Sequence, residues 1–433
     1  MKKRGFRTIG IVLAALIVFG GLCAGYYFAF MDPYRGTIKN PAASPALDTP
    51  MTRQEAEEDL RYLYDHLKSR HPAWLDGSTE LTRAVDRQLQ TELAGLGNSV
   101  TVLDLSRAAG RIAAQLHDGH TWVRWNNPEA PRYIDDFAQA RAYGPPASVN
   151  GVPTEDLFAT YLSMTSYELE FYAKARFQNS VLFEEAPLRM CGVDTAQGID
   201  MSFQTADGPV ARHYDFVPIE QVAGYEPNQN ERKWVEYSID AERSLGIFTL
   251  RSCDMNAEYA KALDEFFAEV FANGIENIAV DLRGNGGGNS QVAGEFLKYI
   301  DVDSYASWDN AVRFGWYLWK NTDVVCVNRK KPVTFDGNLF VLTDAYTFSS
   351  AMDFAMLIGD NRLGVLVGGT SGNSPDGYGD CLFFQMPNSK NLISVSYKRW
   401  YRLDKTKLGE PLTPDYEVPP AEALDKVYEL IGA

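Results

Sequence analysis

Two histidines and an aspartate stand close together in the segment His117-Asp-Gly-His-Thr121. A histidine can take up a proton near neutral pH, so His120 is a candidate general base. The two histidines could instead bind a metal, but a zinc site needs three or four ligands, and the other three histidines of the chain have no matching spacing. A surface or helix-capping role is the simpler alternative for these side chains. We therefore predict no metal site here.

A second segment, Asp281-Leu-Arg-Gly-Asn-Gly-Gly-Gly288, is rich in glycine and follows a short apolar run. Its order does not match the glycine spacing of a dinucleotide-binding loop, and no Gly-Lys-Ser or Gly-Lys-Thr follows, so nucleotide binding is not predicted. Consecutive glycines instead let backbone N–H groups approach a ligand closely and stabilise a developing oxyanion. A tight turn between a strand and a helix is the alternative, although it needs fewer glycines.

A third segment, Thr347-Phe-Ser-Ser-Ala-Met-Asp353, lies between a predicted strand and a predicted helix. A serine at such a corner holds its hydroxyl clear of the sheet. The N–H of the following residue then points into the site, and the helix N-terminus favours negative charge. The alternative is an ordinary serine N-cap, which is common. Each of the three segments taken alone is compatible with a purely structural role.

Regular alternation of strands and helices after Val235 predicts the scaffold that positions these segments. The predicted strands are residues 245–250, 278–282, 339–342 and 364–367, and the predicted helices are 259–271, 292–299, 351–358 and 421–431. This alternation is typical of an α/β domain with a largely parallel sheet. Two further strands, 382–386 and 392–397, flank a turn and predict a hairpin. We assign residues 236–433 to this catalytic core.

The region before the core divides into two smaller parts. Thr52 and Glu55 have the spacing of a capping box, and apolar residues at helical spacing follow up to residue 116. Residues 51–140 are therefore predicted to form a helical subdomain that ends in the strand containing His120. Residues 141–235 show mixed signals and are predicted to form a separate small module.

The first 31 residues predict a membrane anchor. Four basic residues precede an uncharged, mostly apolar run (Ile9–Phe30), which is long enough to cross a bilayer of roughly 30 Å as a helix. The basic flank predicts a cytoplasmic N-terminus and an extracytoplasmic remainder. A cleaved signal peptide is the alternative, but the run is long and no A-x-A site follows it. Residues 32–50, rich in proline, are predicted to be an extended tether.

Composition excludes several classes of function. The net charge is −16, and the first 31 residues contain four basic and no acidic residues, so the remainder has a net charge of −20. A nucleic-acid binder needs clustered Lys and Arg, and no such cluster occurs. The five cysteines are far apart, which argues against a zinc ribbon or a disulfide-dense scaffold. Most of them are expected to be small buried apolar residues.

Together, and in this order, the three segments resemble the motifs of the tail-specific (C-terminal-processing) serine peptidases, particularly the tricorn-like branch. The stretches that match are D-G-H-T at 118–121, D-L-R-G-N-G-G-G at 281–288 and T-F-S-S-A-M-D at 347–353, with later signals at 368–372, 386–389 and 413–418. The resemblance extends over residues 51–418. It implies an α/β domain of crotonase-like build, an N-terminal helical piece and often a PDZ-like module, of which residues 149–153 look like a degenerate trace.

The resemblance also implies which residues act. The family's nucleophile has an acidic residue three positions later, so Asp353 selects Ser350, with Ser349 as the alternative. Some members pair this serine with a lysine about two dozen residues downstream. Here that position falls near Ser374, and the nearest lysine is Lys390, so a Ser-Lys pair is not predicted.

The tricorn-like branch uses a histidine in the D-G-H-T segment, which makes His120 the base. A hydroxyl is a weak nucleophile that needs such an adjacent base. The branch also has a glutamate before the final Pro-Asp, and we choose Glu410 over Asp404 as the acid that orients His120. The backbone N–H groups of Gly287 and Ala351 are predicted to form the oxyanion hole.

The sequence therefore predicts a membrane-anchored, extracytoplasmic serine endopeptidase that acts on polypeptides without a metal or organic cofactor. The first alternative is a catalytically inactive, peptide-binding relative of the same fold. A second alternative, an acyltransferase or hydratase of crotonase-like fold, would need an acyl-carrier site, and no basic feature of the chain suggests one. The sequence does not predict an oligomeric state.

Overall fold

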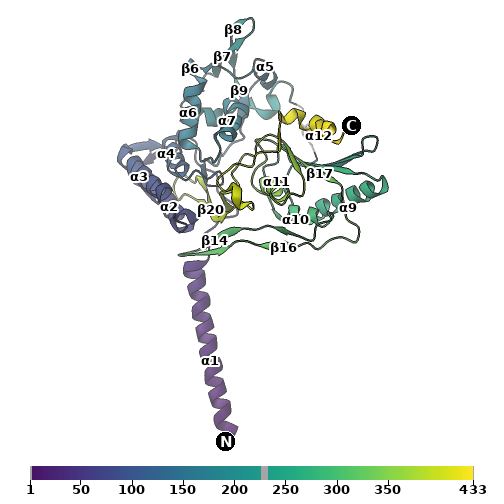
Figure 1. Ribbon diagram of the computed structural model, residues 1–433. Coiled ribbons are helices and arrows are strands. Elements are labelled where there is room, and N and C mark those ends of the chain that lie inside the picture. The colour runs from purple at the N-terminus through teal and green to yellow at the C-terminus, as the bar shows by residue number, and fades with distance from the viewer. Residues whose placement is uncertain (1, 226–232, 433) are drawn as a thin grey trace.

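The computed structural model describes residues 2–225 and 233–432 and shows a folded body at the end of one long helix (Figure 1). Helix α1 (Lys2–Tyr26) continues as a π-helical turn over Tyr27–Met31. Residues Val12–Met31 are long and apolar enough to cross a membrane, a property that a signal sequence shares. The side chains of the first eleven residues, including the predicted basic flank, lie outside the described part of the chain.

The centre of the body is a six-stranded sheet with the strand order β10-β11-β12-β17-β18-β21. Strand β10 is antiparallel to β11, and the other neighbours are parallel, so the prediction of a largely parallel sheet is confirmed. The strands are β10 (Val235–Asp240), β11 (Leu245–Leu250), β12 (Asn277–Asp281), β17 (Asn338–Thr343), β18 (Val365–Gly368) and β21 (Tyr416–Glu417). Because β12 and β17 are adjacent and parallel, the glycine segment and the serine segment emerge at the same edge of the sheet.

Helices cover both faces of this sheet, and the alternation of side chains along β12 shows how. Ile278 and Val280 are fully buried in the cluster that includes α9 (Ala257–Ala272), α10 (Gln291–Leu297) and α11 (Ser350–Asp360). Ala279, which points to the other face, belongs to the smaller cluster formed with α12 (Ala423–Ile431). A strand buried on both faces needs a continuous apolar run, which explains why 278–282 lacks the alternation of a surface strand.

The N-terminal subdomain contains α2 (Arg53–Arg70), α3 (Thr79–Gly95) and α4 (Val102–Ala114). The predicted capping box at Thr52 and Glu55 is present, and Thr101 with Asp104 forms a second one at the start of α4. Each box satisfies backbone N–H groups that a helix start leaves unpaired. Short strands β1 (Pro50–Thr52) and β2 (Ser99–Thr101) pair just before α2 and α4, so the two helix starts are held together.

A second sheet joins this subdomain to the core. It contains β15 (Tyr317–Asn321), β14 (Asn310–Phe314), β20 (Leu392–Trp400) and β19 (Tyr378–Gln385), all antiparallel. Strand β3 (Trp122–Arg124), which follows His120, pairs with β20. The predicted hairpin 382–386/392–397 is thus confirmed, and it fixes the strand that follows the candidate base.

The mixed module has a hydrophobic core of its own and forms the top of the body in Figure 1. Its four-stranded sheet has the order β6-β5-β7-β8, and strands β4 (Arg132–Ile134) and β9 (Phe216–Pro218) pair beside it. The sheet strands are β5 (Ser148–Val149), β6 (Val152–Pro153), β7 (Ile199–Thr205) and β8 (Gly208–Tyr214), and the helices are α5 (Phe137–Ala142), α6 (Thr154–Met164), α7 (Glu170–Asn179) and α8 (Glu185–Met190). Its core begins at Ile134, ahead of the predicted boundary at 141.

The predicted tether, residues 32–50, is fastened to the body rather than free. The N–H of Ile38 donates to the carbonyl of Phe383 at 2.9 Å, and the hydroxyls of Tyr34 and Tyr397 lie 2.7 Å apart. Ser44 and Leu47 are both 2% exposed. Proline-rich composition suits a segment that lies along a sheet edge as well as it suits a free linker, and here the edge of β19 is the partner.

Candidate active site

The two serines of the third segment have different environments. Ser350 is buried at the first turn of α11, where its hydroxyl donates to the carbonyl of Gly288 at 2.8 Å and accepts from the hydroxyl of Ser290 at 2.8 Å. Ser349, one residue earlier, is only half-buried, and its hydroxyl makes no hydrogen bond among the residues that the structure describes. The more accessible hydroxyl at this corner is therefore that of Ser349.

The backbone at Ser349 is strained, with φ 54° and ψ −124°. A side chain with a Cβ rarely adopts positive φ, and such outliers concentrate at functional sites. The nucleophilic serine of α/β-hydrolases likewise sits on a strained turn between a strand and a helix. Two hydrogen bonds hold this conformation: the N–H of Ser349 donates to the side-chain Oδ1 of Asn373 at 2.7 Å, and the N–H of Asp353 donates to the carbonyl of Ser349 at 2.8 Å.

Gly287 packs against this turn more closely than any other residue type could. A Cβ built on Gly287 would lie 2.7 Å from the Cβ of Ser349 and 2.8 Å from the backbone N of Ser350, and Gly287 has φ +98°. The glycine run is therefore required for the close approach of two backbones, in agreement with the prediction for this segment.

The predicted oxyanion donors are not the ones that the structure leaves open. The N–H of Gly287 donates to Asn285 Oδ1 at 2.8 Å, and the N–H of Ala351 donates to the carbonyl of Phe348 at 3.1 Å. In contrast, the N–H groups of Ser350 and Gly288 donate to no acceptor within residues 2–225 and 233–432. The available pair thus includes the residue that follows Ser349, which is the arrangement expected if Ser349 is the nucleophile.

His120 lies in the short segment before β3, and two carboxylates face it. Its Nδ1 is 3.7 Å from Asp118 Oδ1 and 3.9 Å from Glu168 Oε1. Both ring nitrogens are buried and have no hydrogen-bond partner among the described residues. The ring packs on Phe348, with centroids 4.9 Å apart, directly before the serine pair. Burial lowers the pKa of His120, but the carboxylates of Asp118, Glu168 and Asp380 outweigh it and raise the pKa above its ordinary value.

Asp118 is fully buried and is held by a second histidine. His71 Nε2 lies 3.1 Å from Asp118 Oδ2, and neither side chain has any exposed surface. Because His71 Nδ1 accepts a hydrogen bond from the N–H of Ala73, the proton is on Nε2, and this nitrogen donates to Asp118. Burial raises the pKa of Asp118, but the interactions with His120 and His71 outweigh it and hold the pKa well below the usual range. Asp118 is therefore a fixed negative charge beside the candidate base.

Glu168, in the loop between α6 and α7, was not predicted. Its carboxylate accepts from the N–H of Ser374 at 2.8 Å and the N–H of Gly119 at 3.3 Å. Burial raises the pKa of Glu168 to about 7, with a smaller upward contribution from the charge of Asp118, while His120 and the backbone donors lower it. The loop has no motif in the sequence, so only the folded structure could identify this residue.

The acids chosen from the sequence lie elsewhere. Glu410 is exposed, and among the described residues its side chain makes no ion pair or hydrogen bond with His120. Asp404 caps the short helical turn at Lys405–Lys407 through the N–H of Thr406. The prediction of Glu410 is corrected accordingly, because the segment before the final Pro-Asp runs along the surface while Asp118 and Glu168 occupy the space beside His120.

The segment 371–374 joins the serine side and the histidine side of the site. Asn373 accepts the N–H of Ser349, and the next residue, Ser374, donates to Glu168. The aligned position of the lysine in the Ser-Lys branch thus holds a serine that contacts the acid, so the absence of that lysine is consistent with a histidine base.

Histidine and two carboxylates could in principle bind a cation. The ligand atoms of Asp118, His120 and Glu168 all lie within 4.8 Å of one another. The same three groups are also close enough for the carboxylates to act on the His120 imidazole directly, without an ion.

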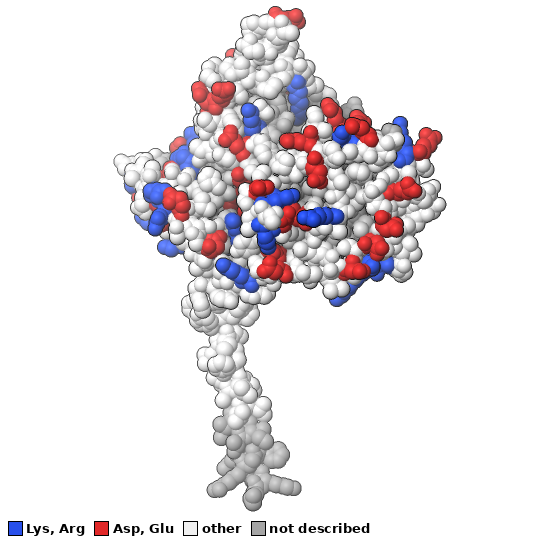
Figure 2. All heavy atoms as spheres, viewed as in Figure 1, with Lys and Arg blue, Asp and Glu red and all other residues white. Residues whose placement is uncertain are grey.

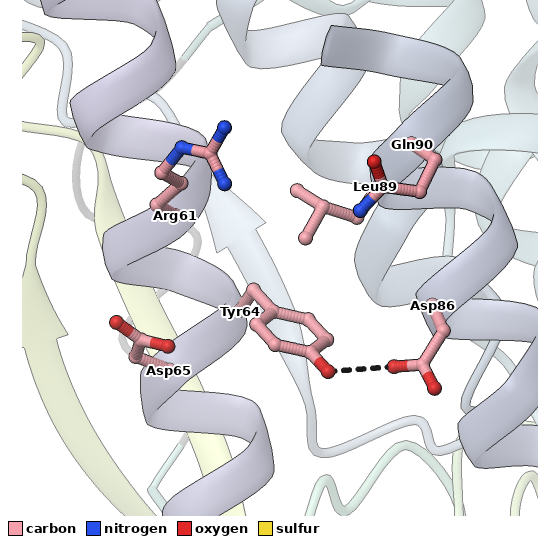
Figure 3. A pocket seen from close by; sticks show the side chains of 6 residues that line it. All are labelled: Arg61, Tyr64, Asp65, Asp86, Leu89 and Gln90. Carbon is pink, nitrogen blue, oxygen red and sulfur yellow. Dashed lines mark hydrogen bonds between the residues drawn. The ribbon is translucent and has the colours of Figure 1, made fainter.

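A separate hollow on the surface lies between α2 and α3 and contains none of these residues. Its lining is polar and charged, and the hydroxyl of Tyr64 donates to Asp86 at 2.7 Å across it (Figure 3). The lining residues are Arg61, Tyr64, Asp65, Asp86, Leu89 and Gln90. No strained backbone, glycine run or unpaired N–H group accompanies this hollow, so the candidate active site remains the serine and histidine cluster.

The family model of peptidase family S41 matches residues 244–418, which include the glycine and serine segments. This match supports the resemblance to tail-specific peptidases that the sequence motifs indicated, and it supports a serine-type peptidase. No curated protein sequence matches the chain at a significant level.

Solved structures with the same fold extend the match beyond these residues. A structure of mature CPAF has a TM-score of 0.61 and 13% identity, and the match covers 88% of this chain and 96% of that one. A structure of a CPAF S499A mutant gives 0.62 and 13%, with 88% and 97% covered. A putative peptidase from Parabacteroides merdae gives 0.51 and 14%, with 88% and 98% covered. At these identities the similarity shows only the fold, and it includes the N-terminal half of the chain.

Proposed function

We propose that this protein is a membrane-anchored, extracytoplasmic serine endopeptidase in which Ser349 is the nucleophile and His120 the general base. The observation that carries the proposal is the strained, half-buried Ser349 beside two unengaged backbone N–H groups, with Phe348 packed on His120. The sequence-based choice of Ser350 is revised because its hydroxyl is buried and already donates to a backbone carbonyl.

In the proposed reaction the hydroxyl oxygen of Ser349 attacks the peptide carbonyl carbon while its proton moves to His120. The N–H groups of Ser350 and Gly288 donate to the oxygen that becomes negative, and losing one such donor typically costs about 10² to 10³ in rate. The C–N bond then breaks, and His120 gives its proton to the leaving amine. A water molecule, deprotonated by His120, hydrolyses the acyl-enzyme and restores the serine.

The two carboxylates have different roles in this scheme. Asp118 is ionised throughout and stabilises the protonated imidazole, as the buried acid does in other serine peptidases. Glu168 titrates near neutral pH, with a pKa of about 7, so its charge varies under working conditions. His71 is a positioning residue, because its Nε2 donates to Asp118 and keeps that carboxylate in place.

The helix that includes Val12–Met31 is proposed to remain as an anchor, with a cytoplasmic N-terminus and the body outside. This rests on the apolar length of the span, on the basic residues before it and on the absence of an A-x-A site after it. The body is further proposed to combine a crotonase-like core with a PDZ-like module whose sheet, β5 to β8, grips the substrate chain.

The proposal is tested by measuring turnover of flexible peptides by the full chain in detergent. Ser349→Ala and His120→Ala are each expected to lower kcat by about 10⁴-fold or more. Ser350→Ala is the matched comparison and is expected to lose less than about tenfold, because the backbone N–H is kept.

Three outcomes would contradict parts of this proposal. If Ser350→Ala abolishes turnover and Ser349→Ala does not, the nucleophile is Ser350. If all three variants match the wild type, the observed hydrolysis does not use this site. If the wild type itself is inactive but binds peptides, the peptide-binding alternative replaces the peptidase.

A further inference from the structure

The hairpin formed by β14, the turn at Gly315 and Trp316, and β15 exposes large aromatic side chains. Trp316 is 64% exposed, Tyr317 49% and Trp319 51%. These three side chains therefore lie outside the hydrophobic core. We refer to residues 310–321 as the aromatic hairpin. Exposed aromatic residues that cluster on one turn indicate a surface that something else covers.

The end of the apolar helix packs directly on this turn. Trp316 Nε1 donates to the hydroxyl of Tyr26 at 2.9 Å. A Cβ on Gly315 would lie 2.1 Å from the carbonyl oxygen of Phe30, so the turn approaches the helix end as closely as a glycine allows. Figure 1 shows α1 leaving the body beside β14. Since Phe30 is the penultimate residue of the apolar span, the aromatic hairpin is at the level where the span ends.

Two neighbouring features concern the part of the body nearest the end of the apolar helix. The segment after the span is fastened along β19, so no free linker separates the helix end from the body. Strand β16 (Val325–Val327) lies along the same lower edge of the body in Figure 1, and its Val325 and Val327 are 65% and 80% exposed. Figure 2 shows few charged side chains where the helix meets the body, in contrast to the charged surface above.

We propose that the aromatic hairpin lies in the interfacial region of the lipid bilayer and holds the body against the membrane surface. Tryptophan and tyrosine concentrate at this level because one end of each ring is apolar and the other donates a hydrogen bond. The occupant of the exposed surface is therefore lipid rather than a second protein chain. This inference rests on the proposed retention of the anchor.

The absence of tryptophan before Trp74 allows a specific test. The full chain is reconstituted into phosphatidylcholine and phosphatidylglycerol vesicles with or without brominated acyl chains, which quench tryptophan at short range. Any quenching then comes from the body, because the apolar span contains no tryptophan. The wild type is expected to be quenched, and Trp316→Phe/Trp319→Phe is expected to lose more than half of the quenching. Trp234→Phe, a matched change on β10's side of the core, is expected to keep it.

Flotation of the same vesicles and peptide turnover in detergent separate the possible failures. A chain that floats but is not quenched overturns the proposal, and so does undiminished quenching in the double variant. A chain that does not float contradicts the anchor, and the proposal falls with it. Retained turnover in the double variant shows that it is folded. Ser349→Ala should be quenched like the wild type, so failure of the catalytic proposal leaves this result unaffected.

Discussion

The serine side and the histidine side of the active site are built in different ways. The serine side comes from two loops that follow adjacent parallel strands, and its geometry is set by backbone: a strained residue, a glycine contact and two unengaged N–H groups. The histidine side collects side chains from four distant segments, at residues 71, 118–120, 168 and 380. Backbone geometry of the first kind is encoded locally, whereas the second exists only after the chain has folded.

The largest loss of turnover on the histidine side is expected when one acid, Asp118, is replaced. Asp118→Asn is expected to lower kcat by about 10³ to 10⁴, because the neutral amide cannot stabilise the protonated His120. The matched control, Glu410→Gln, alters an exposed acid and is expected to leave kcat and KM close to wild type. Peptide turnover by the two variants measures the difference. A larger loss of turnover in Glu410→Gln than in Asp118→Asn would show that Glu410, as predicted from the sequence, is the acid that supports His120.

On the serine side, the corresponding prediction concerns backbone alone. Gly287→Ala is expected to lower kcat by about 10² to 10³, because its Cβ would displace Ser349 and the Ser350 N–H from the oxyanion. Gly284→Ala is the control, since Gly284 has a similar positive φ of +75° but nothing within 4 Å of its Cβ. It should cost only about 1 kcal/mol of stability, visible as a small fall in Tm. Equal losses of turnover in both variants would show that the loss comes from a Cβ at positive φ and not from the contact of residue 287 with Ser349.

The smallest effect is a shift in pH dependence. The charge of Glu168 raises the pKa of His120, and turnover requires neutral His120, so Glu168→Gln should move the acidic limb of kcat/KM to lower pH. Glu168 and His120 titrate as a coupled pair, so the apparent pKa of the acidic limb reflects both groups. An unchanged limb would mean that the carboxylate does not interact with the base in solution.

Stability should respond to the same substitution with a defined sign. The pKa of Glu168 is raised from 4.5 to about 7 in the folded protein, so its contribution is fully favourable below about pH 4.5 and is lost as pH rises through 7. Glu168→Gln should therefore gain Tm relative to the wild type between pH 5 and pH 8. A relative loss of Tm in Glu168→Gln over that range would contradict a raised pKa of the buried Glu168 carboxyl.

The sequence predicted the parts of the fold that local pattern determines. The strand at 245–250, the capping box at Thr52 and the hairpin of β19 and β20 were all expected, because hydrophobic period and turn residues specify them. The motifs also located the serine corner and His120. The spacing to Asp353 selected Ser350, whereas the proposed nucleophile is Ser349, because the strained backbone at Ser349 becomes apparent only in the fold.

What the sequence could not supply depended on distant contacts. Glu168 lies in an ordinary polar loop and becomes an active-site group only because Ser374 and Gly119 meet it in the fold. The exposure of the aromatic hairpin was likewise not predicted, because large aromatic residues are usually buried. Its exposure follows from its place next to the membrane-length helix, which no local pattern records.

The pairing of β3 with β20 has a consequence for the timing of activity during biosynthesis. Within residues 2–225 and 233–432, the strand after His120 has its only ladder partner at residues 392–394, near the end of the chain. A chain that is still being synthesised cannot position His120 through this pairing until residues 392–394 have been made. Activity that depends on His120 is therefore expected only after nearly the whole chain has been made.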